Sequence, residues 1–448
     1  MTVARELAAY LLKVSYEDLP EDAVENAKKV IASTLASAAQ GSTIESARIV
    51  RELAREQGGK PEATAWFSDG LRLPLANAAR VNAMLSDAAA SDDSDLRNIA
   101  HTGTIVTAVS LAAAEQTGAS GRDVLAAMVA GYEASGRIGE AISPGLGERG
   151  FHACIITAFG GVIAAARLLG LTVEQTAQAI ALAATSMGGL AISTNGLSRE
   201  YHAGAAALSA VNAVLAAAKG FTGVEEILEA RRGFLETFGA KEGAAEALTR
   251  DFGASWDIVT DLAIKVRPGA HPLSAAVEAA INAAREGNVA AAAVESIRVS
   301  GPRFRALVGH KHPTDLVGAI HSLAYYLAAA VADREFSWQH VSMEKVLDPE
   351  IGRLQDLVEV EPMTDASLYT WGWGATVTIR MKDGAGHRAT VNAPLGSGPR
   401  GIEWSDVEHK FRTLMPESGK SRGDIERVLA LIHGFEEERG VSRLIGLA

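Results

Sequence analysis

The sequence has little cysteine, no excess of positive charge and no long uninterrupted apolar run, and each shortage excludes a class of protein. Cys154 is the only cysteine among 448 residues, which rules out an intramolecular disulfide framework and favours a reducing compartment. The formal net charge of −12 argues against a nucleic-acid-binding surface. Glycine or polar residues interrupt the apolar runs before they reach the roughly 18 positions of a membrane span. We therefore expect a cytoplasmic protein with no nucleic-acid or membrane partner.

What the sequence has in abundance is alanine at helical spacing. Apolar residues make up 48% of the chain, and its length predicts two domains. Residues 150–223 read as three Ala-rich helices, in which Gly170 ends the first and Thr172 with Gln175 forms a capping box for the second. The third is expected to begin near Tyr201. Other helices are expected over residues 4–14, 21–39, 44–57, 74–89, 104–116, 121–142, 225–230, 233–239, 245–250, 405–415 and 421–438.

After residue 264 the pattern changes, because β-branched residues cluster in short runs. Strands are expected over residues 296–301, 357–362, 375–381 and 387–393, and helices over 274–284 and 315–332. The predicted fold class is mainly α, with a large all-helical domain and a smaller α+β domain. Residues 1–264 and 396–448 form the predicted helical domain, and residues 265–395 the smaller one.

Several motifs resemble those of the MmgE/PrpD family. They are GFH at 150–152, AAARLLGL at 164–171, HAG at 202–204 and KVRPGAHP at 265–272, in that order. The resemblance covers nearly the whole chain and implies an enzyme that moves a proton beside a carboxylate of a small di- or tricarboxylate. It also implies that the C-terminal helices return to the first domain.

The resemblance implies four catalytic residues. Lys265 matches the family's active-site lysine, His152 its GFH histidine and His101 a histidine after an aspartate-rich loop, while Tyr325 falls on the tyrosine of a helix. Each also has a structural alternative: a solvated basic loop for Lys265, a cap or hydrogen-bonded histidine for His101 and His152, and a core tyrosine for Tyr325.

Four further residues are predicted to bind substrate. Arg199 stands where the family often has lysine, which points to carboxylate binding more than to proton transfer. Arg267 and His271 lie in the same basic segment as Lys265. Ser94 replaces the threonine of the family's aspartate-rich loop, and Ala90 replaces its first aspartate. We expect His202 and Cys154 to have structural roles.

No Walker loop and no HExxH motif occurs, so we predict that the enzyme uses no cofactor and no metal. A dehydratase of the 2-methylcitrate type is the first choice of reaction. The alternatives are an epimerase of an amino- or imino-dicarboxylate, a decarboxylase of the cis-aconitate type, and a non-catalytic homologue, for which Ala90 is the best support. The weakly charged, Ala-rich helices also predict a homodimer.

Overall fold

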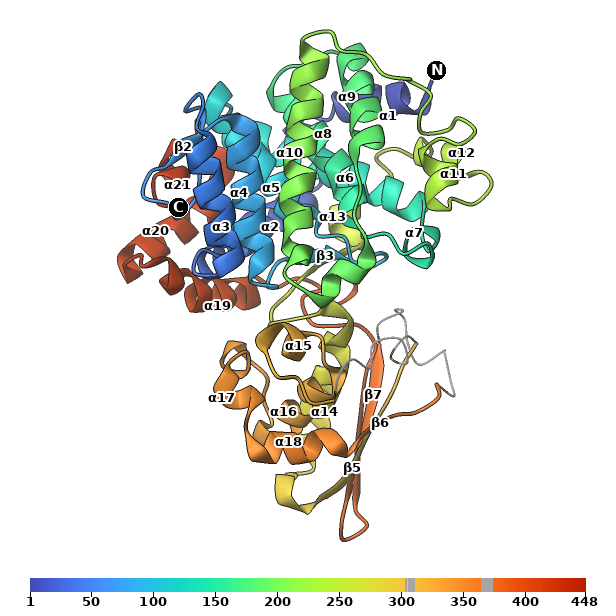
Figure 1. Ribbon diagram of the computed structural model, residues 1–448, viewed down its shortest axis with the longest axis vertical. Coiled ribbons are helices and arrows are strands. Elements are labelled where there is room, and N and C mark those ends of the chain that lie inside the picture. The colour runs from blue at the N-terminus through green and yellow to red at the C-terminus, as the bar shows by residue number, and fades with distance from the viewer. Residues whose placement is uncertain (303, 305–310, 364–373) are drawn as a thin grey trace. The chain divides into compact units, whose positions relative to one another are not determined.

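The chain folds into two compact units, seen in the computed structural model, which describes residues 1–302, 304, 311–363 and 374–448 (Figure 1). The first unit comprises residues 1–264 and 403–448, and the second comprises residues 265–402. The chain thus returns to the first unit at residue 403, whereas the boundary predicted from the sequence was residue 396. The first unit is almost entirely helical and the second combines helices with a sheet, so the predicted fold class is confirmed.

The first unit is built of helices that pack on one another. They are α1 (Val3–Leu11), α2 (Glu21–Gly41), α3 (Glu45–Gln57), α4 (Leu75–Ala88), α5 (Thr102–Thr117), α6 (Gly121–Ala141), α7 (Gly145–Glu148), α8 (Cys154–Leu168), α9 (Val173–Ser186), α10 (Ser198–Ala218), α11 (Phe234–Phe238), α12 (Ala244–Leu248), α13 (Asp257–Thr260), α19 (Trp404–Leu414), α20 (Arg422–His433) and α21 (Ser442–Ile445).

Helix α8 is the central element of this unit. It packs against α5, α6, α9 and α10, and every residue from Cys154 to Ala166 is buried. Small side chains let the helices approach closely, and a Cβ atom on Gly161 would lie only 2.8 Å from that of Ala210 on α10. The alanine and glycine content of this segment therefore serves close helix packing.

The predicted helix ends around Gly170 are confirmed. Gly170 has a φ of +70°, and the amide of Leu171 donates to the carbonyl of Ala166 at 2.9 Å, as in a Schellman ending. Thr172 and Gln175 then form the predicted capping box of α9. Helix α10 begins at Ser198, three residues before the expected start, so His202 lies within the helix.

Two predicted helices are wrong in detail. Residues 225–230 form turns, because the carboxylate of Glu225 accepts hydrogen bonds from Arg5 and Thr2 and does not cap a helix. The helix expected over 315–332 is divided into α15 (Leu316–Ile320) and α16 (Leu323–Asp333), because the Ser322 hydroxyl accepts from the amide of Tyr325 and starts a new helix.

Two short antiparallel ladders also belong to the first unit. Strand β1 (Ala63–Thr64) pairs with β2 (Arg72–Leu73), and β3 (Asp93–Asp95) pairs with β4 (Leu262–Ile264), where Asp93 is opposite Ile264. The polar segment at residues 91–104 thus contains a strand, and the three residues of that strand are buried. The pairing of β3 with β4 thus places the acidic residues Asp93 and Asp95 in the interior of the helical unit.

The second unit is a four-stranded sheet covered by helices. Its strands β5 (Val294–Ser300), β6 (Val358–Val360), β7 (Ala375–Met381) and β8 (Gly386–Val391) lie in the order β6-β5-β7-β8, with only β5 and β6 parallel. The four predicted strands are confirmed. Besides α15 and α16, the helices are α14 (Ser274–Glu286), α17 (Met343–Val346) and α18 (Pro349–Asp356).

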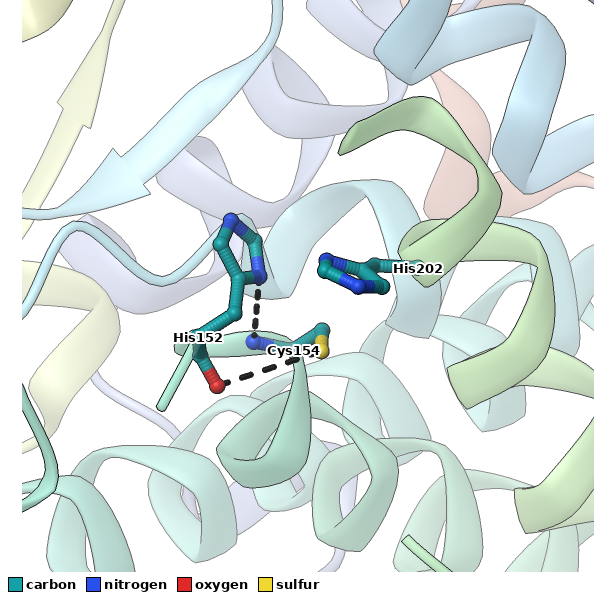
Figure 2. Close-up of side chains that lie close together, drawn as sticks. All are labelled: His152, Cys154 and His202. Atoms are coloured by element: carbon teal, nitrogen blue, oxygen red, sulfur yellow. Dashed lines mark hydrogen bonds between the residues drawn. The ribbon is translucent and has the colours of Figure 1, made fainter. Parts of the chain in front are cut away.

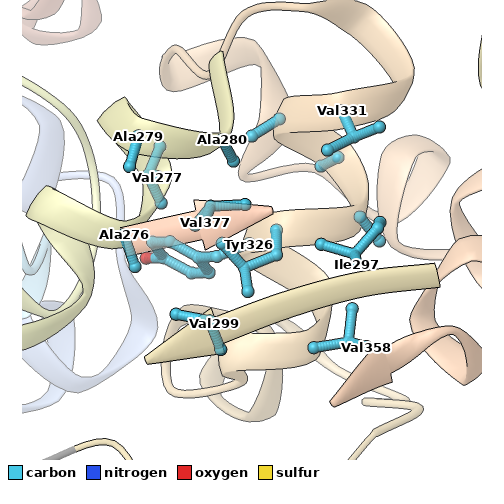
Figure 3. Packing of buried hydrophobic residues seen from close by; sticks show 14 of the residues in the cluster. Ala276, Val277, Ala279, Ala280, Ile297, Val299, Tyr326, Val331, Val358 and Val377 are labelled. Atoms are coloured by element: carbon cyan, nitrogen blue, oxygen red, sulfur yellow. The ribbon is translucent and has the colours of Figure 1, made fainter. Parts of the chain in front are cut away.

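The core of this unit lies between the sheet and two of these helices. Valines and an isoleucine of β5, β6 and β7 meet small residues of α14 and the side chains of Tyr326 and Val331 on α16 (Figure 3). The hydroxyl of Tyr326 also donates to the carbonyl of Pro268, in the segment that leads into α14.

One described helix, α10, is long and apolar enough to cross a membrane by length and composition. Half of its most apolar stretch is buried inside the first unit, as in the core helix of a folded domain.

Candidate active site in the helical unit

His101 lies at the N-terminus of α5 and presents one ring nitrogen to a group of acceptors. Its Nδ1 atom lies 2.7 Å from the main-chain oxygen of Asp93, 3.1 Å from Oδ2 of Asp92 and 3.4 Å from Oγ of Ser94. A carbonyl and a carboxylate can only accept, so the contacts place a proton on Nδ1. In neutral His101 the lone pair is therefore on Nε2, the nitrogen available for proton transfer.

Asp93 fixes the segment that carries His101. Its carboxylate accepts the amides of Gly103 and Thr104 at 2.7 and 3.1 Å and the hydroxyl of Tyr132 at 3.0 Å. It therefore caps α5 from a strand ten residues earlier. Burial, and next the charge of Asp92, raise the pKa of the Asp93 carboxyl.

Arg199 and Asp87 form a buried ion pair in the same unit. The guanidinium Nη1 lies 3.4 Å from Oδ2 of Asp87, and Nη2 donates to the Asp87 carbonyl at 2.8 Å. Burial alone would lower the pKa of Arg199, but Asp87 and Asp92 outweigh that effect and raise it. Arg199 thus already holds a carboxylate of the protein, and its predicted substrate contact stays a prediction.

His152 comes just before α8, where its imidazole faces that of His202 on α10 (Figure 2). The ring centroids are 4.6 Å apart. The Nδ1 atom of His152 accepts the amide of Cys154 at 3.1 Å, which puts the proton of the neutral ring on Nε2. Burial, and next the nearby His202, lower the pKa of His152 to about 3, and burial also lowers that of His202. Both rings are therefore neutral at pH 7.

The structure places Lys265, Arg267, His271 and Tyr325 in the second unit. Lys265 directly follows strand β4, and Arg267 pairs with Glu278 at 3.8 Å. His271 is buried in a short turn before α14.

Tyr325 lies in the core of the second unit. Its hydroxyl donates to the main-chain carbonyl of His340, and its neighbour Tyr326 donates to that of Pro268 at 3.2 Å. These contacts give Tyr325 a packing role in the described structure, and its part in acid–base chemistry stays a prediction.

Among the predicted residues, the first unit therefore contains His101, Ser94, His152 and Arg199. Sequence reasoning did not select Asp87, Asp92 or Asp93, whose side chains pair with Arg199, contact His101 and cap α5. It assigned His202 a structural role, and that role stays a prediction. The available signal was the adjacent pair Asp92 and Asp93 in an otherwise apolar region, because two neighbouring acids there need partners.

Comparison with known proteins identifies the family of the chain. The MmgE/PrpD N-terminal domain model matches residues 5–247 and the MmgE/PrpD C-terminal domain model matches residues 269–431. The chain is 26% identical to a cis-aconitate decarboxylase of Aspergillus terreus over 99% of its own length and 95% of the relative's. It is 24% identical to the human cis-aconitate decarboxylase over 98% of its own length and 92% of the length of the human protein. The chain therefore belongs to the MmgE/PrpD family.

Proposed function

We propose that the protein is a carboxylate lyase, and that it releases CO2 from a small unsaturated tricarboxylate of the cis-aconitate kind. The family and the relatives that are cis-aconitate decarboxylases support this choice. Dehydration, which the sequence favoured, and epimerisation remain predictions that the experiment below separates.

The observation that carries the proposal is the orientation of His101. Since Nδ1 faces the Asp93 carbonyl and the Asp92 carboxylate, Nε2 is the atom that can give a proton to a substrate carbon. When the ring carries its second proton, that proton is on Nε2, while the Asp92 carboxylate faces Nδ1 as an acid faces the histidine of a catalytic triad. His101 is thus the proposed proton donor.

The reaction balances with one proton. The bond between the leaving carboxylate and its carbon breaks, and the electron pair moves through the adjacent double bond to a second carbon. That carbon takes the proton from His101 Nε2, so a tricarboxylate and one proton give a dicarboxylate and CO2. The remaining carboxylates must be held while negative charge develops between them.

Cations are required because the group around His101 is itself acidic. The Asp92 carboxylate lies beside His101 and that of Asp87 pairs with Arg199, so positive side chains are needed to hold the carboxylates of the substrate near these acids. Lys265 is the proposed carboxylate holder, joined by Arg267.

Proton NMR in D2O tests the proposal. The purified protein is incubated with cis-aconitate, citrate, 2-methylcitrate and N-substituted aspartates. Loss of one carbon with deuterium in the product supports decarboxylation. A vinyl signal from a hydroxy acid with all its carbons retained would establish dehydration, and deuterium beside an intact carboxylate would establish epimerisation. Turnover of none of these compounds would contradict the proposal.

A further inference from the structure

Lys410 is a fully buried lysine close to the residues that hold His101. It lies on α19, in the part of the chain that returns to the first unit, and is 0% exposed. Its Nζ atom donates to Oγ of Ser33 on α2 at 2.7 Å and to the main-chain oxygen of Ser91. An amine is tolerated in the interior where acceptors and opposite charges compensate for the lost water. The position of Lys410 therefore indicates a role tied to these neighbours.

The Ser91 carbonyl that Lys410 contacts directly precedes Asp92 in the chain. That carbonyl is bonded to the amide nitrogen of Asp92, so the Nζ atom lies within about 6 Å of the Cα atom of Asp92. The Asp92 carboxylate lies 3.1 Å from Nδ1 of His101 and accepts the hydroxyl of Thr104 at 3.2 Å. Two contacts and one peptide bond thus connect the amine of Lys410 to the ring of His101.

The turn that carries Ser91 is strained and needs support. Ala90 has a φ of +49°, a left-handed conformation that residues with a side chain rarely adopt. A residue keeps such a conformation only where its surroundings fix it. The hydroxyl of Ser91 donates to Oε1 of Gln40 at 3.0 Å, and the carbonyl of Ser91 accepts from Lys410. The position of the next residue, Asp92, therefore depends in part on Lys410.

The positive charge of Lys410 also suits this region. Asp87 and Asp92 are 2% and 0% exposed, and Arg199 pairs with Asp87. Lys410 brings a second buried cation beside these acids, and a negative charge in the interior is stabilised where a positive charge lies near it. A cation here favours the charged form of Asp92, the form that can only accept from Nδ1 of His101.

We infer that Lys410 is a positioning residue for His101, which acts through the Ser91 carbonyl and the Asp92 carboxylate and helps to keep the proton of the neutral ring on Nδ1. Its effect on the reaction rate rests on the proposed function of His101, whereas its effect on the ring does not. The structural alternative is that Lys410 only joins α19 to α2 through Ser33.

Heteronuclear NMR of the full-length protein with isotope-labelled histidines tests this inference without a substrate. A protonated and an unprotonated imidazole nitrogen differ widely in chemical shift, and the signals of His101 are identified by their loss in His101→Gln. Well above the ordinary histidine pKa of about 6.5, the unmodified protein should carry a proton on Nδ1 of His101. In Lys410→Met the Asp93 carbonyl still faces Nδ1, so we expect a partial change. The Nδ1 signal should shift, and the tautomer protonated on Nε2 should become detectable.

Lys28→Met is the matched control. Lys28 is a second buried lysine, 3% exposed, on the same helix α2 that carries Ser33. Its Nζ atom donates to the carbonyl of His433 and pairs with Glu436, so it joins α2 to C-terminal residues as Lys410 does, but at a different place. Lys28→Met should therefore lower the Tm and leave the nitrogen signals of His101 unchanged.

Steady-state kinetics of decarboxylation gives a second readout. With His101 as the proton donor, Lys410→Met should lower kcat by up to about 100-fold and change KM little, because a misplaced donor slows the chemical step more than binding. Lys410→Arg keeps the charge and a donor for the Ser91 carbonyl, so it should restore part of the loss. Lys28→Met should keep the kcat of the unmodified protein.

If Lys410→Met does not fold, Lys410→Gln, which removes the charge but keeps a donor, serves in its place. The inference is overturned if the folded variant leaves both nitrogen signals of His101 unchanged, or if Lys28→Met shifts them equally. Shifted signals together with no decarboxylation by the unmodified protein would uphold the role of Lys410 and reject the proposed reaction.

Discussion

The imidazole Nδ1 of His101 lies 2.7 Å from the main-chain oxygen of Asp93, whose own carboxylate caps the helix that begins after His101. One residue thus orients the histidine through its backbone and holds the helix through its side chain. This double contact fixes which nitrogen of His101 carries a proton and where the ring lies.

Replacing His101 with glutamine should remove most of the activity. A positioned acid or base contributes about 10²–10⁴-fold to a rate, so kcat should fall by that range in the decarboxylation assay. The Tm should change little, because the glutamine amide can still donate to the Asp93 carbonyl and the Asp93 carboxylate still caps α5. His433→Gln, in the same unit, is the control. Full activity of His101→Gln would remove this histidine from the mechanism.

Lys265 should matter for its positive charge. In Lys265→Ala a carboxylate of the substrate loses its partner, so kcat/KM should fall at least about 30-fold, equivalent to ~2 kcal/mol. Lys265→Arg should retain more of the activity than Lys265→Ala because it keeps the charge. Steady-state kinetics with both variants measures the difference. Equal losses in the two variants would indicate that the ammonium transfers a proton and does not merely bind.

The buried pair of Arg199 and Asp87 should be important for stability. Arg199→Met leaves Asp87 charged in the interior, which destabilises a protein by about 3–5 kcal/mol. Adding Asp87→Asn should recover part of the loss, because the second change removes the uncompensated charge. Urea unfolding followed by circular dichroism measures the free energy of unfolding of the single and the double variant.

The exposed pair of Arg412 and Glu426 is the matched comparison for Arg199 and Asp87. Nε of Arg412 lies 2.8 Å from Oε1 of Glu426, but both side chains are more than 40% exposed. Breaking this ion pair should therefore lower the free energy of unfolding by at most about 1 kcal/mol. Similar costs for the two pairs would show that burial is not the deciding factor.

The sequence was sufficient for features that depend on neighbouring residues. Gly170, Thr172 and Gln175 mark a helix end and the next start by local chemistry, and the structure shows both. The strands of the second unit were predictable because their β-branched runs are long enough to show a pattern.

Features that join distant residues could not be predicted in this way. Strands β3 and β4 have three residues each and lie more than 160 positions apart, so neither shows a period and nothing local indicates their pairing. The meeting of His152 with His202 follows in the same way from the packing of α8 against α10, which no local pattern indicates. The MmgE/PrpD resemblance supplied His101 and His152 as candidates, but not their partners.

Gly269 should tolerate no side chain. Its φ is +96°, and a Cβ atom would lie 1.2 Å from the hydroxyl oxygen of Tyr326. Gly269→Ala should therefore lower the Tm of the second unit's unfolding, through both backbone strain and the clash. In the double variant with Tyr326→Phe the contact with the hydroxyl oxygen is removed, but Cζ of the ring would still lie 2.4 Å from the new Cβ atom and the backbone strain remains, so the Tm should recover only in part. A Tm unchanged by Gly269→Ala would contradict the close approach.

The contact between Arg5 and Glu225 should make stability depend on pH in the acid range. Hydrogen bonds from Arg5, and next from Thr2, lower the pKa of the Glu225 carboxyl from 4.5 to about 2. The carboxylate is charged in the folded state over a range where the unfolded chain is protonated. Its contribution is therefore present above about pH 4.5 and is lost as the pH falls toward 2.

We expect Glu225→Gln to lower the free energy of unfolding by about 1 kcal/mol at pH 7, since solvent screens part of a partly exposed pair. At pH 3.5 the difference from the unmodified protein should be smaller, because the stabilising charge is then being lost. Urea unfolding at the two pH values measures it, with the exposed Glu242→Gln as control. A difference that grows on acidification would mean that the pKa of Glu225 is raised by folding, and that burial outweighs the bond to Arg5.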